Sequence, residues 1–177
     1  MRGRSFGEMQ DQQEVYMELF DVYDRDGNPT GQTMVRGEPM PEGCYRMVAG
    51  VLCMHTDGTV LLMKRHPDKS THPNLYEASA SGSVLAGETP EQAARRELLE
   101  ETGIRCGALT PVYAERDATR LFRYYAAVVD QPKEAVTLQP GETVAYLWAD
   151  RAQLAQLLAA DPSPVILHEG VCRYLGL

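Results

Sequence analysis

The sequence predicts an α/β (α+β) protein in which a mixed central sheet is covered by helices on both sides. Three observations lead to this prediction: strand-like segments precede a central helix, further strands follow it, and helical segments stand near the C-terminus. A chain of 177 residues, 44% hydrophobic and 24% charged, is typical of one globular domain with a substantial core. We expect a flexible polar tail at residues 1–14 and a single domain at residues 15–177.

The first half of the chain predicts two hairpins. Residues 17–23 and 31–35 are strand-like and flank Asp-Gly and Asn-Pro pairs, which favour turns, so we expect an N-terminal hairpin. Residues 45–54 and 60–64 have the character of core strands and are joined by an Asp-Gly turn. A polar, proline-containing connection follows at residues 65–75.

The central helix has clear signals at both ends. Thr89 suits the N-cap, Pro90 the first helical position, and Gln92 completes a Thr-x-x-Gln capping box. Gly103 supplies the C-terminal stop, so the helix is expected to span residues 90–102. The elements expected after it are strands at residues 121–129 and 143–148 and helices at residues 152–159 and 165–174.

Three acidic residues lie in the last two turns of this helix. Glu97, Glu100 and Glu101 occupy an arc of roughly 100° on one face. Like charges at this spacing repel one another, and they stand toward the negative end of the helix dipole. A divalent cation such as Mg²⁺ reverses the sign of these interactions, because hard ions bind carboxylate oxygens. The cluster therefore predicts a metal site.

The whole segment around these acids, residues 82–104, reads GSVLAGETPEQAARRELLEETGI and resembles the Nudix box. The box has the pattern Gly-x5-Glu-x7-Arg-Glu-U-x-Glu-Glu-x-Gly-U, with U aliphatic, and this chain follows it without a departure. The resemblance implies the α/β/α sandwich of Nudix proteins. The positions that fill the box are Gly82, Glu88, Arg96, Glu97, Leu98, Glu100, Glu101, Gly103 and Ile104.

The resemblance also implies the roles of individual residues. Glu97 and Glu101 would be the principal ligands of Mg²⁺, for which Mn²⁺ is a substitute, and Glu100 would assist. The carbonyl oxygen of Ser81, just before the box glycine, is a candidate backbone ligand. Arg96 belongs to the catalytic set as the residue that would pair with a box glutamate and hold it in orientation, a role that Glu88 would share.

Outside the box, each candidate has two interpretations. Glu142 stands where many relatives place a general base or further ligand, yet it also fits a solvent-facing loop carboxylate. Arg65 and Lys69 are candidate contacts for substrate phosphates, or they belong to a solvated strand end. Tyr76, Tyr124 and Tyr125 are candidates for stacking on a base, or they pack within their strands.

The activity implied is Mg²⁺-dependent hydrolysis of the pyrophosphate linkage in a nucleoside diphosphate linked to another moiety. One alternative comes from residues 17–150, which resemble the Nudix branch that includes isopentenyl-diphosphate isomerase. Isomerases of this type carry a cysteine immediately before the box glycine and a histidine immediately after it, whereas this chain has Ser81 and Ser83. Serine is a poorer group for protonation chemistry. The second alternative is a Nudix binding module without catalytic activity.

Composition restricts the partners. A net charge of −8 argues against general binding of nucleic acid or of an anionic membrane. The resemblance to Nudix proteins implies a small nucleotide-type diphosphate as the partner. No apolar run has transmembrane length, and the start of the sequence lacks a signal peptide. The four cysteines are widely separated and are expected to be reduced thiols in a cytoplasmic protein. A homodimer through the N-terminal hairpin stays open.

Overall fold

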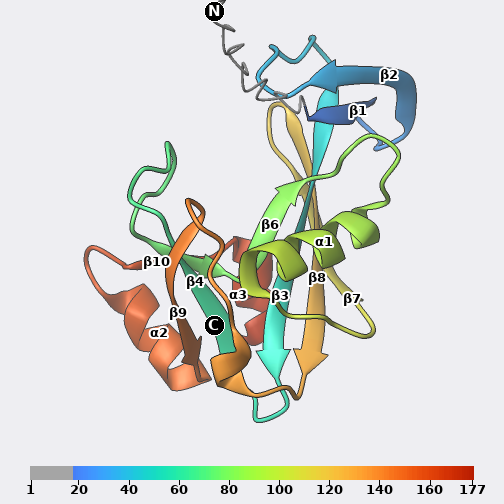
Figure 1. Cartoon of the computed structure of the whole chain (residues 1–177). Helices are drawn as coiled ribbons and strands as arrows, with labels where there is room; N and C mark the ends of the chain where they lie inside the picture. The colour runs from blue at the N-terminus through green and yellow to red at the C-terminus, as the bar shows by residue number, and fades with distance from the viewer. Residues whose placement is uncertain (1–17) are drawn as a thin grey trace, which may run out of the picture.

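The computed structural model describes residues 18–177, so the tail predicted at residues 1–14 lies outside the described part of the chain. A mixed sheet forms the middle layer, with α1 (Pro90–Thr102) in front of it and α3 (Glu169–Leu175) behind it (Figure 1). Helix α2 (Arg151–Ala159) packs against strands on the side of α3. The predicted α/β/α sandwich with a mixed sheet is confirmed.

The N-terminal hairpin is also confirmed. Strands β1 (Leu19–Tyr23) and β2 (Pro29–Val35) pair antiparallel. The side chain of Asp24 closes the turn between them by accepting hydrogen bonds from two backbone N–H groups, at 2.8 and 2.9 Å. These bonds are the physical basis of the turn signal in the sequence.

Strand β3 (Tyr45–His55) is the centre of the sheet. It pairs antiparallel with β1 and with β6 (Ala80–Ser83), and parallel with β8 (Arg120–Val129) from Arg46 to His55. Its side chains alternate between two clusters, one under α1 and one beside α2 and α3. This alternation means that both faces of β3 are covered by protein.

Of the second predicted hairpin, the structure confirms the turn but only one paired position between its two strands. Strand β4 (Val60–Arg65) pairs with β3 at a single position and then diverges from it. Its remaining residues pair antiparallel with β5 (Tyr76–Ala78) and β9 (Thr143–Ala149). The two strands part because β3 continues along β6 and β8, whereas β4 leads into the group of strands under α2.

Several further elements differ from the sequence-based expectation, and the short strands β5 and β6 are among those not predicted. Strand β7 (Thr110–Arg116), which pairs antiparallel with β8, was not predicted. The prediction of a helix at residues 165–174 was wrong for its first residues. Val165 and Ile166 form β10, which pairs parallel with β5, and α3 begins only at Glu169. A short 3₁₀ helix, η1, spans Lys133–Ala135.

Helix α1 has the predicted bounds and caps. The Oγ1 atom of Thr89 accepts from the Gln92 N–H at 3.2 Å, and the Gln92 side chain accepts from the Thr89 N–H at 2.8 Å. Gly103 ends the helix with a left-handed φ of 72°. Leu98 is fully buried and fixes the helix on the sheet, which turns Glu97 and Glu101 toward β6.

The four cysteines are free, as predicted. Within residues 18–177 there is no helix with the length and apolar character needed to cross a bilayer.

Candidate active site

The glycine of β6 lies against the helical acids. A Cβ atom added to Gly82 would stand only 2.0 Å from Oε1 of Glu97, which is far inside van der Waals contact. The Glu97 carboxylate therefore occupies the space that any side chain at residue 82 would need. This close approach brings α1 and β6 together around one cavity.

Arg96 on α1 forms ion pairs with three glutamates at once. Its guanidinium donates to Oε1 of Glu97 at 2.7 Å, to Oε1 of Glu88 at 2.8 Å and to Oε2 of Glu100 at 3.3 Å. It also donates to the carbonyl oxygen of Ser83 at 3.0 Å, which links the helix to β6. Hydrogen bonds to Glu88 raise the pKa of Arg96, and the same bonds lower the pKa of Glu88. The structure thus contains the ion pair predicted between Arg96 and a box glutamate.

This arrangement changes the argument for the acidic cluster. The sequence-based argument takes the mutual repulsion of Glu97, Glu100 and Glu101 as the reason for a metal. In the structure, Arg96 already supplies a positive charge to Glu97 and Glu100. Of these three acids, only Glu101 has no cationic side chain paired with it among the described residues.

Glu101 is a buried carboxylate without a cationic partner. Its exposed fraction is 8%, and within residues 18–177 it forms no ion pair. Burial, followed by the charges of Glu97, Glu77 and Glu142, raises its pKa well above the ordinary value of 4.5. An ionised Glu101 is consequently unfavourable in this position unless a cation joins it.

The cavity in front of Glu101 has a volume of about 220 Å³ and an excess of negative charge. Six glutamates and four cationic side chains line it, which leaves two formal negative charges. Each lining cation is paired with at least one lining glutamate. These pairs are Arg36 with Glu18, Arg65 with Glu77, Lys69 with Glu142, and Arg96 with Glu97 and Glu100.

These residues fit a divalent cation. Carboxylate and backbone carbonyl oxygens are the donors that Mg²⁺ and Mn²⁺ prefer. The excess of two negative charges in the lining equals the charge of such an ion. The predicted ligands Glu97, Glu100, Glu101 and Ser81 all line this cavity. Their side chains do not form a complete ligand set in this structure. Among residues 18–177, no three acidic, histidine or cysteine side chains lie close enough together to bind a metal ion. Arg96 engages oxygens of Glu97 and Glu100 instead.

The predicted phosphate and base contacts fall into two groups. Arg65, Lys69 and Glu142 line the acidic cavity, and Lys69 forms an ion pair with Glu142. Tyr76 lines neither cavity described here and packs against the core beside α2, with Lys64 over its ring. Contact between Tyr76 and a substrate therefore has no support in this geometry.

Glu77, the neighbour of Tyr76 in β5, lines the acidic cavity and was not among the predicted site residues. Its carboxylate pairs with Arg65 and contributes to the raised pKa of Glu101. Adjacent residues of a strand point to opposite faces, so a choice of Tyr76 as facing the site excluded Glu77. The position of Glu77 follows from the register that pairs it with Met63 of β4, which belongs to the assembled sheet, so the sequence held no local signal for it.

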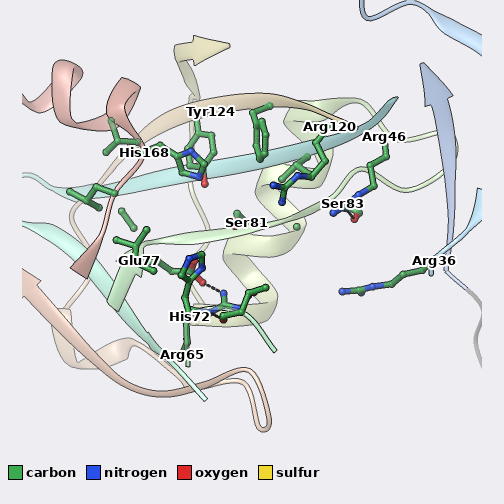
Figure 2. Close-up of a pocket in the computed structure, with 18 residues that line it drawn as sticks. Arg36, Arg46, Arg65, His72, Glu77, Ser81, Ser83, Arg120, Tyr124 and His168 are labelled. Carbon is green, nitrogen blue, oxygen red and sulfur yellow. Dashed lines mark hydrogen bonds and ion pairs between the residues drawn. The ribbon is translucent and has the colours of Figure 1, made fainter. Parts of the chain in front are cut away.

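A second cavity, of about 410 Å³, adjoins the first (Figure 2). The two share residues of β6, namely Ser81, Gly82 and Ser83. Tyr124, for which stacking on a base and packing were both open, lines this second cavity and also stacks on Tyr113 at 4.8 Å between ring centroids. Both interpretations of Tyr124 thus retain support.

Removing the charge of Glu101 is expected to stabilise the metal-free protein above pH 4.5. Because the folded state raises the pKa of this carboxyl, it retains a proton that the unfolded chain has already released. Native protein should therefore lose stability relative to Glu101→Gln as the pH rises from 4.5 through the folded-state pKa. Urea unfolding in EDTA across this range measures the difference, with Glu91→Gln as control. A difference that does not widen with pH would contradict the prediction.

Comparison with known proteins identifies the family. The family model for the NUDIX domain matches residues 45–168. An uncharacterized Nudix hydrolase of Listeria monocytogenes is 42% identical over 88 residues, covering 50% of this chain and 52% of the relative. The chain thus matches about half the length of this curated relative.

Two longer matches extend the comparison beyond the box. An isopentenyl-diphosphate Delta-isomerase of Citrobacter koseri is 26% identical over 154 residues, covering 80% of this chain and 82% of the relative. A crystal structure from Deinococcus radiodurans has a TM-score of 0.65 at 23% identity, covering 81% of this chain and 90% of the other, and it shows a shared fold. The isomerase-like branch seen in the sequence is thus matched as well. With the family model covering most of its length, the chain belongs to the Nudix family.

Proposed function

We propose that this protein is a Mg²⁺-dependent hydrolase that cleaves the pyrophosphate linkage of a nucleoside diphosphate linked to another moiety. The observation that carries the proposal is Glu101, a buried carboxylate with no cationic partner among the described residues, in a cavity with two excess negative charges. Membership of the Nudix family and relatives named Nudix hydrolase support the same reaction.

A bound Mg²⁺ supplies charge neutralisation at the phosphates and a water of lowered pKa. The groups that would hold the ion are the carboxylates of Glu97 and Glu101, assisted by Glu100, and the carbonyl oxygen of Ser81. Arg96 keeps the Glu97 carboxylate in place through its hydrogen bond of 2.7 Å. Mn²⁺ takes the same oxygen donors and would substitute.

The remaining side chains of the cavity act on substrate and water. Arg65 and Lys69 would contact phosphate oxygens, for which guanidinium and ammonium groups are suited. Glu142 would accept a proton from the attacking water as general base. Glu142 lines the cavity, where its carboxylate pairs with Lys69.

Isomerase activity is favoured by the length of the match to an isopentenyl-diphosphate isomerase, and it is opposed by two side chains. Ser81 and Ser83 replace the cysteine and histidine that the isomerase chemistry uses. The Ser83 hydroxyl accepts a hydrogen bond from Nη1 of Arg46 at 2.8 Å, so this position is already engaged by a cation. We therefore propose hydrolysis and keep isomerisation as an outcome of the test.

A substrate panel assayed by ³¹P NMR tests the proposal. We expect at least one nucleoside diphosphate derivative to yield two phosphorylated products with Mg²⁺, and no products in EDTA. Isopentenyl diphosphate belongs in the panel, because its conversion without release of phosphate would identify an isomerase. Tight binding across the panel without turnover would identify a binding module and overturn the proposed hydrolysis.

A further inference from the structure

Three arginines from separate parts of the chain line one side of the second cavity. Arg36 follows β2, Arg46 belongs to β3 and Arg120 begins β8. Figure 2 shows the three side chains on one side of the cavity and Tyr124 and His168 on the other. Arg46 and Arg120 do not line the acidic cavity, whereas Arg36 lines both.

The charge of this second cavity is opposite to that of the first. Four arginines line it, and Glu77, which pairs with Arg65, is the carboxylate among its lining residues. Arg36 and Arg120 pair with Glu18 and Asp117, respectively. The second cavity therefore has an excess of positive charge.

Arg46 is the least compensated of these cations. It is half-buried and forms no ion pair within residues 18–177, and its Nη1 atom donates to the neutral hydroxyl of Ser83. Burial lowers the pKa of Arg46, and the nearby charges of Arg120 and Arg36 lower it further. Guanidinium groups gathered in this way repel one another unless an anion lies between them.

The opposite side of the cavity suits an uncharged part of a ligand. Tyr124 and Val171 provide aromatic and apolar surface there, and the ring of His168 lies 5.0 Å from that of Tyr124. The Phe122 ring lies between the two sides, 5.4 Å from the ring of His168 and 5.0 Å from the guanidinium of Arg120. A cavity with aromatic walls and a few convergent polar groups is typical of a site for an organic ligand. Here the convergent groups are guanidiniums, which bind phosphate through paired hydrogen bonds.

We propose that Arg36, Arg46 and Arg120 bind a phosphate group carried on the organic moiety of the substrate, separate from the pyrophosphate that is cleaved. The assignment rests on the proposed function, which places the pyrophosphate in the acidic cavity. The two cavities meet at Ser81, Gly82 and Ser83 of β6, and Arg46 and Arg120 line only the second of them. The preferred substrate would then be a pyrophosphate whose organic part carries one more phosphate ester.

Titration with inorganic phosphate in EDTA tests the arginine subsite without relying on catalysis. We expect binding to the native protein, and affinity about ten- to a hundredfold weaker in Arg46→Gln and in Arg120→Gln, because each substitution removes a charge-assisted contact. Arg123→Gln is the matched control, since Arg123 lies on the same strand as Arg120 and lines neither cavity. Thermal unfolding confirms that each variant is folded. Native-like phosphate affinity in both folded variants would overturn the subsite.

A competition experiment tests whether the subsite is separate from the pyrophosphate site. Mg²⁺ with methylene bisphosphonate, a pyrophosphate analogue that resists hydrolysis, is added at saturation before the phosphate titration. Unchanged phosphate binding is the expected result. Displacement of phosphate would mean that these arginines hold the pyrophosphate itself and would overturn the proposal. Failure of hydrolysis in the substrate panel leaves both binding results readable, so the two ideas fail independently.

Discussion

The substitution Glu101→Gln is expected to lower turnover by at least about a hundredfold, the order of effect seen when a metal-centred catalytic group is lost. Glutamine keeps the size of the side chain and removes the charge that the cavity would present to a divalent cation. The native carboxylate is buried and has no cationic partner among the described residues, so its charge is available to such an ion. Steady-state kinetics with Mg²⁺ measures the loss as kcat and kcat/KM.

The control for this substitution is Glu91→Gln, on the same helix. Glu91 is exposed in the first turn and lines neither cavity, so its loss should leave turnover near the native value. Thermal unfolding in EDTA separates a catalytic defect from misfolding, since the Glu101 variant is expected to be at least as stable as the native chain at neutral pH. A near-native rate for Glu101→Gln would show that the metal is held by other groups.

Arg96→Gln should lower the free energy of unfolding by about 2–3 kcal/mol, because it leaves three carboxylates without their shared cation. The Arg96 side chain is 24% exposed, so solvent screens these pairs only in part. The substitution also removes the bond to the Ser83 carbonyl that ties α1 to β6. Urea unfolding in EDTA gives the difference.

Two comparisons sharpen the Arg96 experiment. Arg105→Gln removes the same charge from an exposed position and should change the free energy of unfolding by less than about 0.5 kcal/mol. Arg96→Lys retains the charge without the planar fork, so it should recover part of the loss. Equal stability of Arg96→Gln and Arg105→Gln would mean that the guanidinium network contributes nothing measurable.

Helix α1 was predicted to the residue because its signals are local. The capping box at Thr89 and Gln92 and the stop at Gly103 act within one turn of the helix ends, so the sequence alone contains them. Strand partners are set by contacts between distant segments. The sequence could locate β4, therefore, but its pairing with β9 instead of β3 depends on the assembled sheet.

The same distinction between local and long-range signals separates the site residues that the sequence revealed from those that it did not. The acids and Arg96 were found because they share one helix, whose periodicity fixes their relative positions. Glu77 and Arg46 reach the cavities from strands far apart in the chain. In a strand as short as β5, alternation alone does not say which face meets the site. The sequence also gave no means to separate Glu101 from Glu97, since their burial is set by packing.

Because Gly82 has no side chain, strand β6 can pack directly against the Glu97 carboxylate of helix α1. The volume beside its Cα is filled by the tip of Glu97, so the backbone of β6 and the carboxylate behave as one packed unit. Any residue larger than glycine would push that tip aside and alter how its oxygens are presented, even in a chain that folds normally. The distance between β6 and α1 thus fixes where the Glu97 carboxylate lies. If Glu97 binds a metal ion as proposed, a displacement of a fraction of an ångström at this contact would change the geometry of that ligand.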